Sequence, residues 1–204
     1  MYVIALTGGI ASGKTTLLNA LQKHGAPVID ADQISRSLTA KGGEALPLIR
    51  KAFGGDVFHK DGTLDRKALG DLVFSSEPDR RCLEAIIHPM VARRINGELS
   101  GLSPKHRAAV VDVPLLYESG MESMADEVWC AYVPRREQIK RLRLRDGLTE
   151  KQALLRISSQ MDLREKCRRA DHVIKTTGTP AQSAAQAICL WQEAINKLGG
   201  TRFD

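Results

Sequence analysis

Short apolar runs alternate with longer amphipathic stretches along most of this chain. Short, mostly apolar runs are typical of strands that are buried on both faces of a parallel sheet. Strands that alternate with helices in this way form parallel sheets through right-handed crossovers. The pattern therefore predicts an α/β protein with a five-stranded parallel sheet flanked by helices. The predicted strands are residues 2–6, 26–30, 108–112, 127–133 and 172–175.

Helices are predicted where apolar residues recur three and four positions apart. After the first strand, Leu17, Leu18 and Leu21 give one such face, and Gly25 marks its end. Pro89 falls inside the long helical stretch 77–99, and we expect a kink or a break there. The helices predicted farther along the chain are residues 64–74, 77–99, 135–145, 150–159 and 180–198.

Polar residues mark two of these helix starts. Thr149 and Gln152 have the spacing of a capping box, in which each side chain bonds the backbone of the other residue. Asp65 begins a helix after the turn signal Asp61-Gly62, and it fits either a cap or a ligand contact.

Two long segments interrupt the alternation of strands and helices. Residues 39–102 lie between the second and third strands, and residues 134–170 lie between the fourth and fifth. The sequence has no repeat, low-complexity tract or linker that would mark a separate domain. We therefore expect two insertions on a single unit, whose core is formed by about residues 1–38, 103–133 and 171–204.

The segment Gly8-Gly9-Ile10-Ala11-Ser12-Gly13-Lys14-Thr15 fits the phosphate-binding pattern Gly-x-x-x-x-Gly-Lys-Ser/Thr. It lies between a predicted buried strand and a predicted helix, which is the context that the motif requires. Glycines let the turn expose successive backbone amides, and the helix directs its partial positive charge at the same place. The residues expected to bind ATP here are Gly8, Ala11, Ser12, Gly13, Lys14, Thr15 and Thr16.

Acidic residues end two of the predicted strands, and ligands of such sheets bind at the carboxyl ends of the strands. Asp112 follows an apolar run, so it is expected to hold magnesium together with the Thr15 hydroxyl, although a turn or cap aspartate would look the same. Asp30 ends the second strand, and Asp32 lies two residues farther on. Either one suits a carboxylate that orients the attacking hydroxyl of an alcohol, and either one suits the N-cap of a helix at 31–38.

The net charge of +6 is concentrated in one segment. Residues 134–170 hold 12 Lys/Arg and 5 Asp/Glu, a net charge of +7, so the remainder carries −1. This segment suits a nucleic-acid binder or a flap over phosphates, but it has no aromatic residue on which bases would stack. We therefore expect no nucleic-acid partner. We expect Arg141 or Arg145, which share a helix face, to bring a positive charge to the γ-phosphate.

The composition is that of an ordinary globular protein, with 43% hydrophobic and 26% charged residues in a chain of 204. The four cysteines are scattered without a Cys-x-x-Cys pair, so neither a zinc site nor a disulfide framework is indicated. No basic leader precedes the first strand, and no apolar stretch reaches the ~20 residues of a membrane span. We expect a cytoplasmic monomer or weak homo-oligomer without a membrane partner.

Other classes of P-loop protein fit less well. A signalling GTPase reads guanine with Asn-Lys-x-Asp, whereas Asn196-Lys197 continues Leu-Gly. Transporter and motor ATPases usually need a larger chain and a partner subunit. A chain of this length with a basic insertion is typical of small-molecule or nucleotide kinases. The motifs alone therefore indicate an ATP-dependent phosphotransferase acting on an alcohol or a phosphate.

Several segments together resemble one family, dephospho-coenzyme A kinase, over nearly the whole chain. The most specific are the phosphate-binding segment, Asp30-Ala31-Asp32 and Asp112-Val113-Pro114-Leu115-Leu116. The other resembling segments are Leu64-Asp65-Arg66-Lys67-Ala68-Leu69, Ile87-His88-Pro89, Arg141-Leu142-x-x-Arg145-Asp146 and Ala170-Asp171-His172-Val173-Ile174.

The resemblance implies transfer of the γ-phosphate of ATP, with magnesium, to the 3′-hydroxyl of dephospho-coenzyme A, the final step of coenzyme A biosynthesis. A P-loop kinase of another small molecule or nucleotide is the alternative. The resemblance also implies that residues 39–102 bind the acceptor and that residues 134–170 form a lid. It selects Asp32 as the base. It also implies that Arg141 is a catalytic cation in addition to Lys14 and that Arg145 contacts ATP, with both arginines on the lid. The acceptor-binding residues that it implies are His88, Leu115 and Glu118.

Three positions need separate comment. His88, judged from the residues alone, is a packed or surface histidine. Lys175-Thr176-Thr177-Gly178 stands where the family often has Asp-Asn-x-Gly near the adenine, and we assign no side-chain role there. Ala11 replaces a common glycine, so its methyl group is tolerated only if the backbone dihedrals are unstrained.

Overall fold

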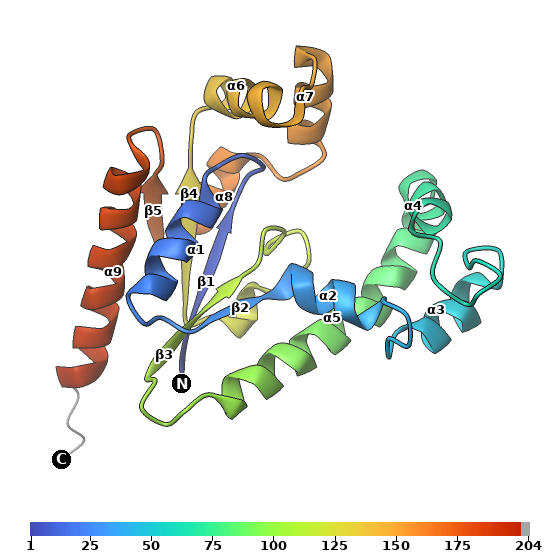
Figure 1. Ribbon diagram of the computed structural model, residues 1–204, viewed down its shortest axis with the longest axis horizontal. Helices are drawn as coiled ribbons and strands as arrows, with labels where there is room; N and C mark the ends of the chain where they lie inside the picture. The colour runs from blue at the N-terminus through green and yellow to red at the C-terminus, as the bar shows by residue number, and fades with distance from the viewer. Residues whose placement is uncertain (201–204) are drawn as a thin grey trace. The chain divides into compact units, whose positions relative to one another are not determined.

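The computed structural model describes residues 1–200, and its ribbon is drawn in Figure 1. The chain divides into two compact units. The first unit comprises residues 1–29 together with the described segment from residue 102 onward, and the second comprises residues 30–101. Among the described residues, no helix is both long enough and apolar enough to cross a membrane.

The first unit is built on a five-stranded sheet. Its strands are β1 (Tyr2–Gly8), β2 (Val28–Asp30), β3 (Ala108–Asp112), β4 (Glu127–Tyr132) and β5 (His172–Lys175). Their order is β2-β3-β1-β4-β5, and β1 pairs in parallel with both β3 and β4, as β4 does with β5. Nearly all of β1 and β3 is buried, as expected for apolar strands covered on both faces. The predicted fold class and the five predicted strands are confirmed.

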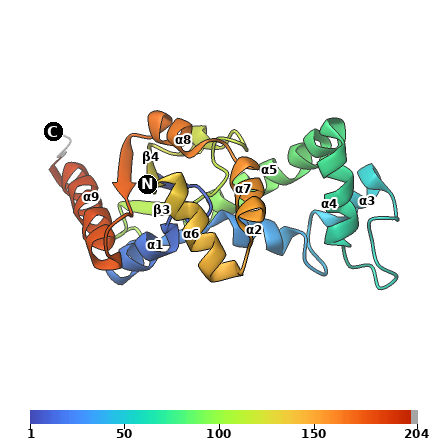
Figure 2. The same cartoon turned by 90° about the horizontal axis from the view of Figure 1, so that it is seen from above.

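Helices cover both faces of this sheet (Figures 1 and 2). α1 (Lys14–Lys23) and α9 (Pro180–Gly200) pack against each other on one face, and α8 (Leu163–Arg169) packs against β1 and β4 on the other. Burial of one face of α1 in this core fixes the direction in which its N-terminus points. The core residues include Ile4, Leu6, Leu17, Leu21, Trp129, Ile174 and Trp191.

The connections on either side of β4 hold further short elements. They are η1 (Glu122–Met124) before the strand, and α6 (Arg135–Asp146), α7 (Glu150–Ser158) and α8 after it. The predicted capping box is confirmed, because Gln152 N–H donates to the Thr149 hydroxyl at 3.3 Å and Thr149 N–H donates to Gln152 Oε1 at 2.9 Å. α8 was not among the predicted helices, and its first turn is capped by the Asp162 side chain.

The second unit is helical. Its helices are α2 (Ala31–Leu38), α3 (Leu46–Phe53), α4 (Arg66–Ser75) and α5 (Glu77–Gly101). α2, α3 and α4 each pack against α5. Asp65 is the N-cap of α4, and its carboxylate accepts hydrogen bonds from the amides of Lys67 and Ala68. Of the two roles that the sequence left open for Asp65, the structure shows the cap.

Pro89 lies inside α5, and the helix is assigned without interruption across it. Of the two predicted alternatives, the break is therefore wrong, and the kink stays a prediction. A proline removes one backbone hydrogen bond, but the buried residues Val91, Ile95 and Leu99 anchor the following turns of the helix. Tertiary packing outweighs the local preference at this position.

Replacing Thr149 with alanine should lower the free energy of unfolding by about 1 kcal/mol, because α7 loses the acceptor for an amide of its first turn. Urea unfolding followed by circular dichroism measures the loss. Thr149→Ser keeps the hydroxyl and should recover most of it. Equal stabilities of the alanine variant and the parent would contradict the capping assignment.

Candidate active site

The phosphate-binding segment, residues 8–15, forms a tight loop between β1 and α1. Ser12 N–H donates to the Gly9 carbonyl at 3.1 Å and closes a turn within the loop. Gly13 follows with φ 84°, a left-handed conformation in which glycine is favoured, and it is the N-cap residue of α1. Because the helix begins directly at Lys14, its unpaired amides and partial positive charge lie at the end of the loop.

Ala11 is the only non-glycine residue with a positive φ in the described part of the chain, at 58°. The condition of unstrained dihedrals is therefore not met, because a left-handed alanine costs about 1–2 kcal/mol. Such a conformation persists only where the surroundings determine it. Contacts from outside the loop must hold this turn.

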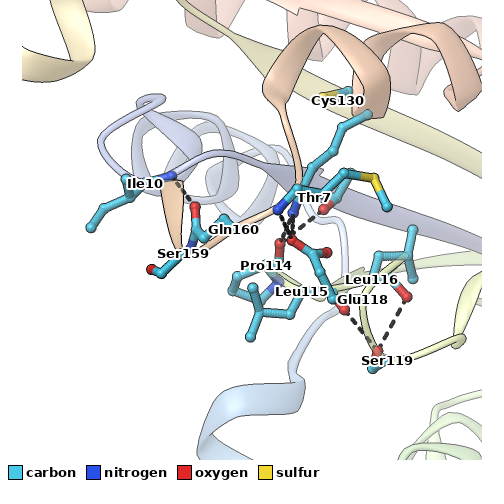
Figure 3. Close-up of polar contacts among 12 residues, drawn as sticks. Thr7, Ile10, Pro114, Leu115, Leu116, Glu118, Ser119, Cys130, Ser159 and Gln160 are labelled. Atoms are coloured by element: carbon cyan, nitrogen blue, oxygen red, sulfur yellow. Dashed lines mark hydrogen bonds and ion pairs between the residues drawn. The ribbon is translucent and has the colours of Figure 1, made fainter. Parts of the chain in front are cut away.

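Side chains from other segments supply those contacts. Three successive loop carbonyls, beginning with that of Ile10, accept hydrogen bonds from outside the loop. The donors, in the order of the carbonyls, are Gln138 at 2.8 Å, Arg141 at 3.2 Å and Thr176 at 2.6 Å. The Ile10 amide donates in turn to Gln160 Oε1 at 2.8 Å (Figure 3). The loop is thus held on both sides of its turn.

Lys14 and Asp112 form an ion pair at the carboxyl ends of β1 and β3. The register of the two strands pairs Leu6 with Asp112, so β3 ends beside the start of the loop. Both side chains are largely buried, with exposed fractions of 15% for the lysine and 10% for the aspartate. Thr15, the next residue of α1, is exposed. The sequence-predicted cation and carboxylate therefore meet at one edge of the sheet.

The two arginines of α6 have different partners. Arg141 also donates to the Thr176 carbonyl at 2.5 Å, so its guanidinium bridges the loop and the segment after β5. Arg145 donates to Asp146 at 2.7 Å, and this hydrogen bond lowers the pKa of Asp146 and raises the pKa of Arg145. Within the described residues, Arg141 is the one of the two that contacts the loop.

The two acids at the end of β2 and the start of α2 have different roles. Asp30 is the N-cap residue, and its side chain accepts from the Gln33 amide at 2.9 Å. Asp32 lies in the first turn with its side chain 51% exposed, and Arg36 is 3.9 Å from its carboxylate. The capping role that the sequence left open belongs to Asp30, which leaves the Asp32 carboxylate accessible.

The three residues predicted to bind the acceptor are divided between the units. His88 is half-buried in α5 of the second unit. Leu115 and Glu118 belong to the first unit, in the loop after β3. Leu115 is 43% exposed, whereas Glu118 is mostly buried.

A fully buried lysine, Lys166 of α8, fixes the loop after β3. Its ammonium group lies 2.7 Å from Glu118 and donates to the Pro114 carbonyl at 2.8 Å. The Thr7 hydroxyl donates to the same carbonyl at 3.2 Å, and the Met161 amide donates to Glu118 at 2.9 Å. A buried ammonium is stable only with such partners. The network joins the end of β1, the loop after β3 and α8.

Four residues that support this site have no predicted role in it: Gln138, Gln160, Lys166 and Thr176. Polar residues in helices and connections usually face solvent, so their identity gave no signal. Thr176 was noticed because it departs from the family pattern, but it was assigned no side-chain role. The structure gives its hydroxyl one, in holding the loop.

A cavity of about 470 Å³ adjoins the loop at Gly9. Its lining includes Tyr132 and Gln138, with Arg135 and Arg164 as cations. The volume is in the range of small-molecule sites, and it shows that the segment 134–170 leaves space beside the loop.

A family model described as dephospho-CoA kinase matches residues 2–182 of this chain. A dephospho-CoA kinase from Symbiobacterium thermophilum is 45% identical over 201 residues, which cover 98% of this chain and 84% of that relative. Among solved structures, TT1252 from Thermus thermophilus is similar with a TM-score of 0.83 and 32% identity, covering 95% of this chain and 97% of that one. A dephospho-CoA kinase from Campylobacter jejuni is similar with a TM-score of 0.69 and 29% identity, covering 94% and 96%.

Replacing Ala11 with glycine should raise the free energy of unfolding by about 1 kcal/mol, because glycine adopts the left-handed conformation without the steric cost of a methyl group. Urea unfolding measures the change. The matched control is Ala185→Gly at an exposed position inside α9, which should lower the same free energy by about 1 kcal/mol. Destabilisation by both substitutions would show that Ala11 is not strained.

Proposed function

The chain belongs to the dephospho-CoA kinase family, and from that premise we propose that it transfers the γ-phosphate of ATP to the 3′-hydroxyl of dephospho-coenzyme A, the last step of coenzyme A biosynthesis. The observation that carries the proposal is the loop at residues 8–15, with Lys14 and Asp112 at its side, on the carboxyl edge of a parallel sheet. Sheets of this kind bind their ligands at that edge.

The phosphates of ATP bind to the loop amides and to the N-terminus of α1. Lys14 exchanges Asp112 for the β- and γ-phosphates, which carry more negative charge than a single carboxylate. Arg141, already in contact with the loop, adds a second cation that neutralises charge developing on the γ-phosphate. The further proposed ATP contacts are Gly8, Ala11, Ser12, Gly13, Thr15, Thr16 and Arg145.

The residues at this edge fit a magnesium ion. Thr15 and Asp112 offer a hydroxyl and a carboxylate, the hard oxygen ligands that magnesium prefers. No group of three or more His, Cys, Asp or Glu side chains suited to a metal occurs within the described residues, and magnesium in kinases characteristically takes its other ligands from phosphates and water. When bound, the ion neutralises phosphate charge.

Asp32 is the proposed base. Its carboxylate is exposed and is not used to cap α2, because Asp30 has that role. The family's proposed base also matches this position. Asp32 orients the ribose hydroxyl toward the γ-phosphorus and accepts its proton, while most of the catalysis comes from positioning and charge neutralisation.

We assign acceptor binding to residues 39–102 and to the loop after β3. Leu115 offers an exposed apolar contact, and His88 offers a half-buried imidazole on α5. Glu118 contributes by holding the loop that carries Leu115, through its contacts with Lys166 and the Met161 amide.

Residues 134–170 are the proposed lid, whose motion admits the substrates and excludes water. We place the reaction in the cytoplasm. The four cysteines, Cys82, Cys130, Cys167 and Cys189, are free thiols, which suits a reducing compartment.

Incubation with ATP, magnesium and dephospho-coenzyme A tests the proposal directly. Mass spectrometry should find a product heavier than the acceptor by one phosphate group, together with ADP. Shikimate, gluconate and nucleoside monophosphates serve as competing acceptors. Phosphorylation of one of these, with dephospho-coenzyme A left unchanged, would reject the proposed acceptor and favour another small-molecule kinase.

Asp32→Asn should lower kcat by about 10²–10⁴-fold, the usual range for general-base assistance. The KM for ATP should stay within about threefold, because the acid acts on the acceptor. The matched control is Asp30→Asn, which removes the same charge but keeps a good N-cap for α2 and should leave kcat within about threefold. Full turnover by Asp32→Asn would show that the base is assigned to the wrong residue.

A further inference from the structure

The Ile10 peptide groups are bonded on both sides by side chains from the proposed lid. Gln138 Nε2, on α6, donates to the Ile10 carbonyl at 2.8 Å. Gln160 Oε1, between α7 and α8, accepts from the Ile10 amide at 2.8 Å (Figure 3). The two side chains use opposite ends of their amide groups, so each one fits the backbone group that it faces.

These bonds hold a turn whose backbone conformation is unfavourable without contacts from outside the loop. Ile10 precedes Ala11, whose φ of 58° is disfavoured for a residue with a side chain. Residues in such conformations are held by the structure around them. Gln138 is 3% exposed, so its amide is committed to the loop rather than to water. The two glutamines therefore restrain the turn at Ile10, the residue that precedes the strained Ala11.

Gly9 provides a second, independent sign of this arrangement. A Cβ atom at Gly9 would lie 2.7 Å from Gln138 Nε2. The φ of Gly9 is not in the left-handed region, so its backbone conformation is open to alanine. Space for the Gln138 amide, rather than the conformation of the backbone, accounts for the glycine.

We propose that Gln138 and Gln160 are positioning residues for ATP, which act through Ile10 to set the geometry of the phosphate-binding loop. The role in ATP binding rests on the proposed function. Both residues lie within 134–170, so any displacement of this segment from the loop breaks bonds to Ile10 on both sides. The shape of the phosphate site is thereby coupled to the position of the lid.

Gln138→Met and Gln160→Met remove the bonds with little change in side-chain length. Each should raise the KM for ATP by about three- to tenfold, the effect of losing one neutral hydrogen bond. The KM for dephospho-coenzyme A should stay within about twofold, because the loop binds only the nucleotide. Gln192→Met, at an exposed position of α9, is the control and should change neither constant.

Glutamate at the two positions separates a specific bond from general packing. Gln160→Glu keeps an acceptor for the Ile10 amide, whereas Gln138→Glu sets a carboxylate against the Ile10 carbonyl. Both add one negative charge, so the KM for ATP should rise clearly more for Gln138→Glu than for Gln160→Glu. Gly9→Ala, which crowds the Gln138 amide, should raise the KM for ATP like Gln138→Met without loss of the fold by circular dichroism.

Calorimetric titration with ADP makes the outcome independent of the acceptor. If the wild type binds ADP but does not phosphorylate dephospho-coenzyme A, the proposed function fails, and the glutamine variants are still compared by their affinity for ADP. A fall of about three- to tenfold in ADP affinity supports the positioning role. Unchanged nucleotide constants in both methionine variants would overturn it, as would equal effects of the two glutamate variants.

Discussion

The parallel pairing of β1 with β3 and β4 is the constraint on which the nucleotide site depends. The register sets Leu6 beside Asp112, so that the carboxylate at the end of β3 reaches Lys14. It also sets Gly8 beside Ala131, where a side chain would come within 3.0 Å of the Ala131 carbonyl. A glycine at the end of β1 therefore lets the chain leave the sheet and turn into the loop.

The loop itself is short and strained, and its shape is determined by residues far away in the sequence. Hydrogen bonds from α6, from the α7–α8 connection and from the segment after β5 reach its backbone. Thr176 stands where the family often has asparagine, and its hydroxyl donates to the Ser12 carbonyl. The Thr176 carbonyl accepts from Arg141, so this residue links the loop to the arginine.

The sequence predicted the parts of this structure that local patterns encode. Apolar runs located all five strands, and the glycines and lysine of the loop identified the phosphate site, because both signals lie within a few neighbouring residues. The resemblance to dephospho-coenzyme A kinases, carried by separate motifs, is confirmed by the family match. The short helices α3 and α8 escaped prediction because seven or eight residues give little periodicity. The equally short α2 was suspected only because Asp30 and Asp32 suit an N-cap at its start.

The supporting contacts of the site could not be predicted from local patterns. Gln138 and Lys166 are buried only because the chain folds back on itself, with bonds that span 128 and 52 residues. Pro89 shows the converse, since a strong local signal is overridden by packing. The strain at Ala11 is likewise a property of the whole loop, whose backbone path is set by contacts that the sequence does not display.

A crystal structure with ADP, magnesium and dephospho-coenzyme A tests the central claim most directly. It should show the β-phosphate against the amides of residues 12–15, Lys14 moved from Asp112 to the phosphate, and the glutamine bonds to Ile10 in place. A nucleotide bound elsewhere, with the loop empty and Lys14 still paired to Asp112, would contradict the account.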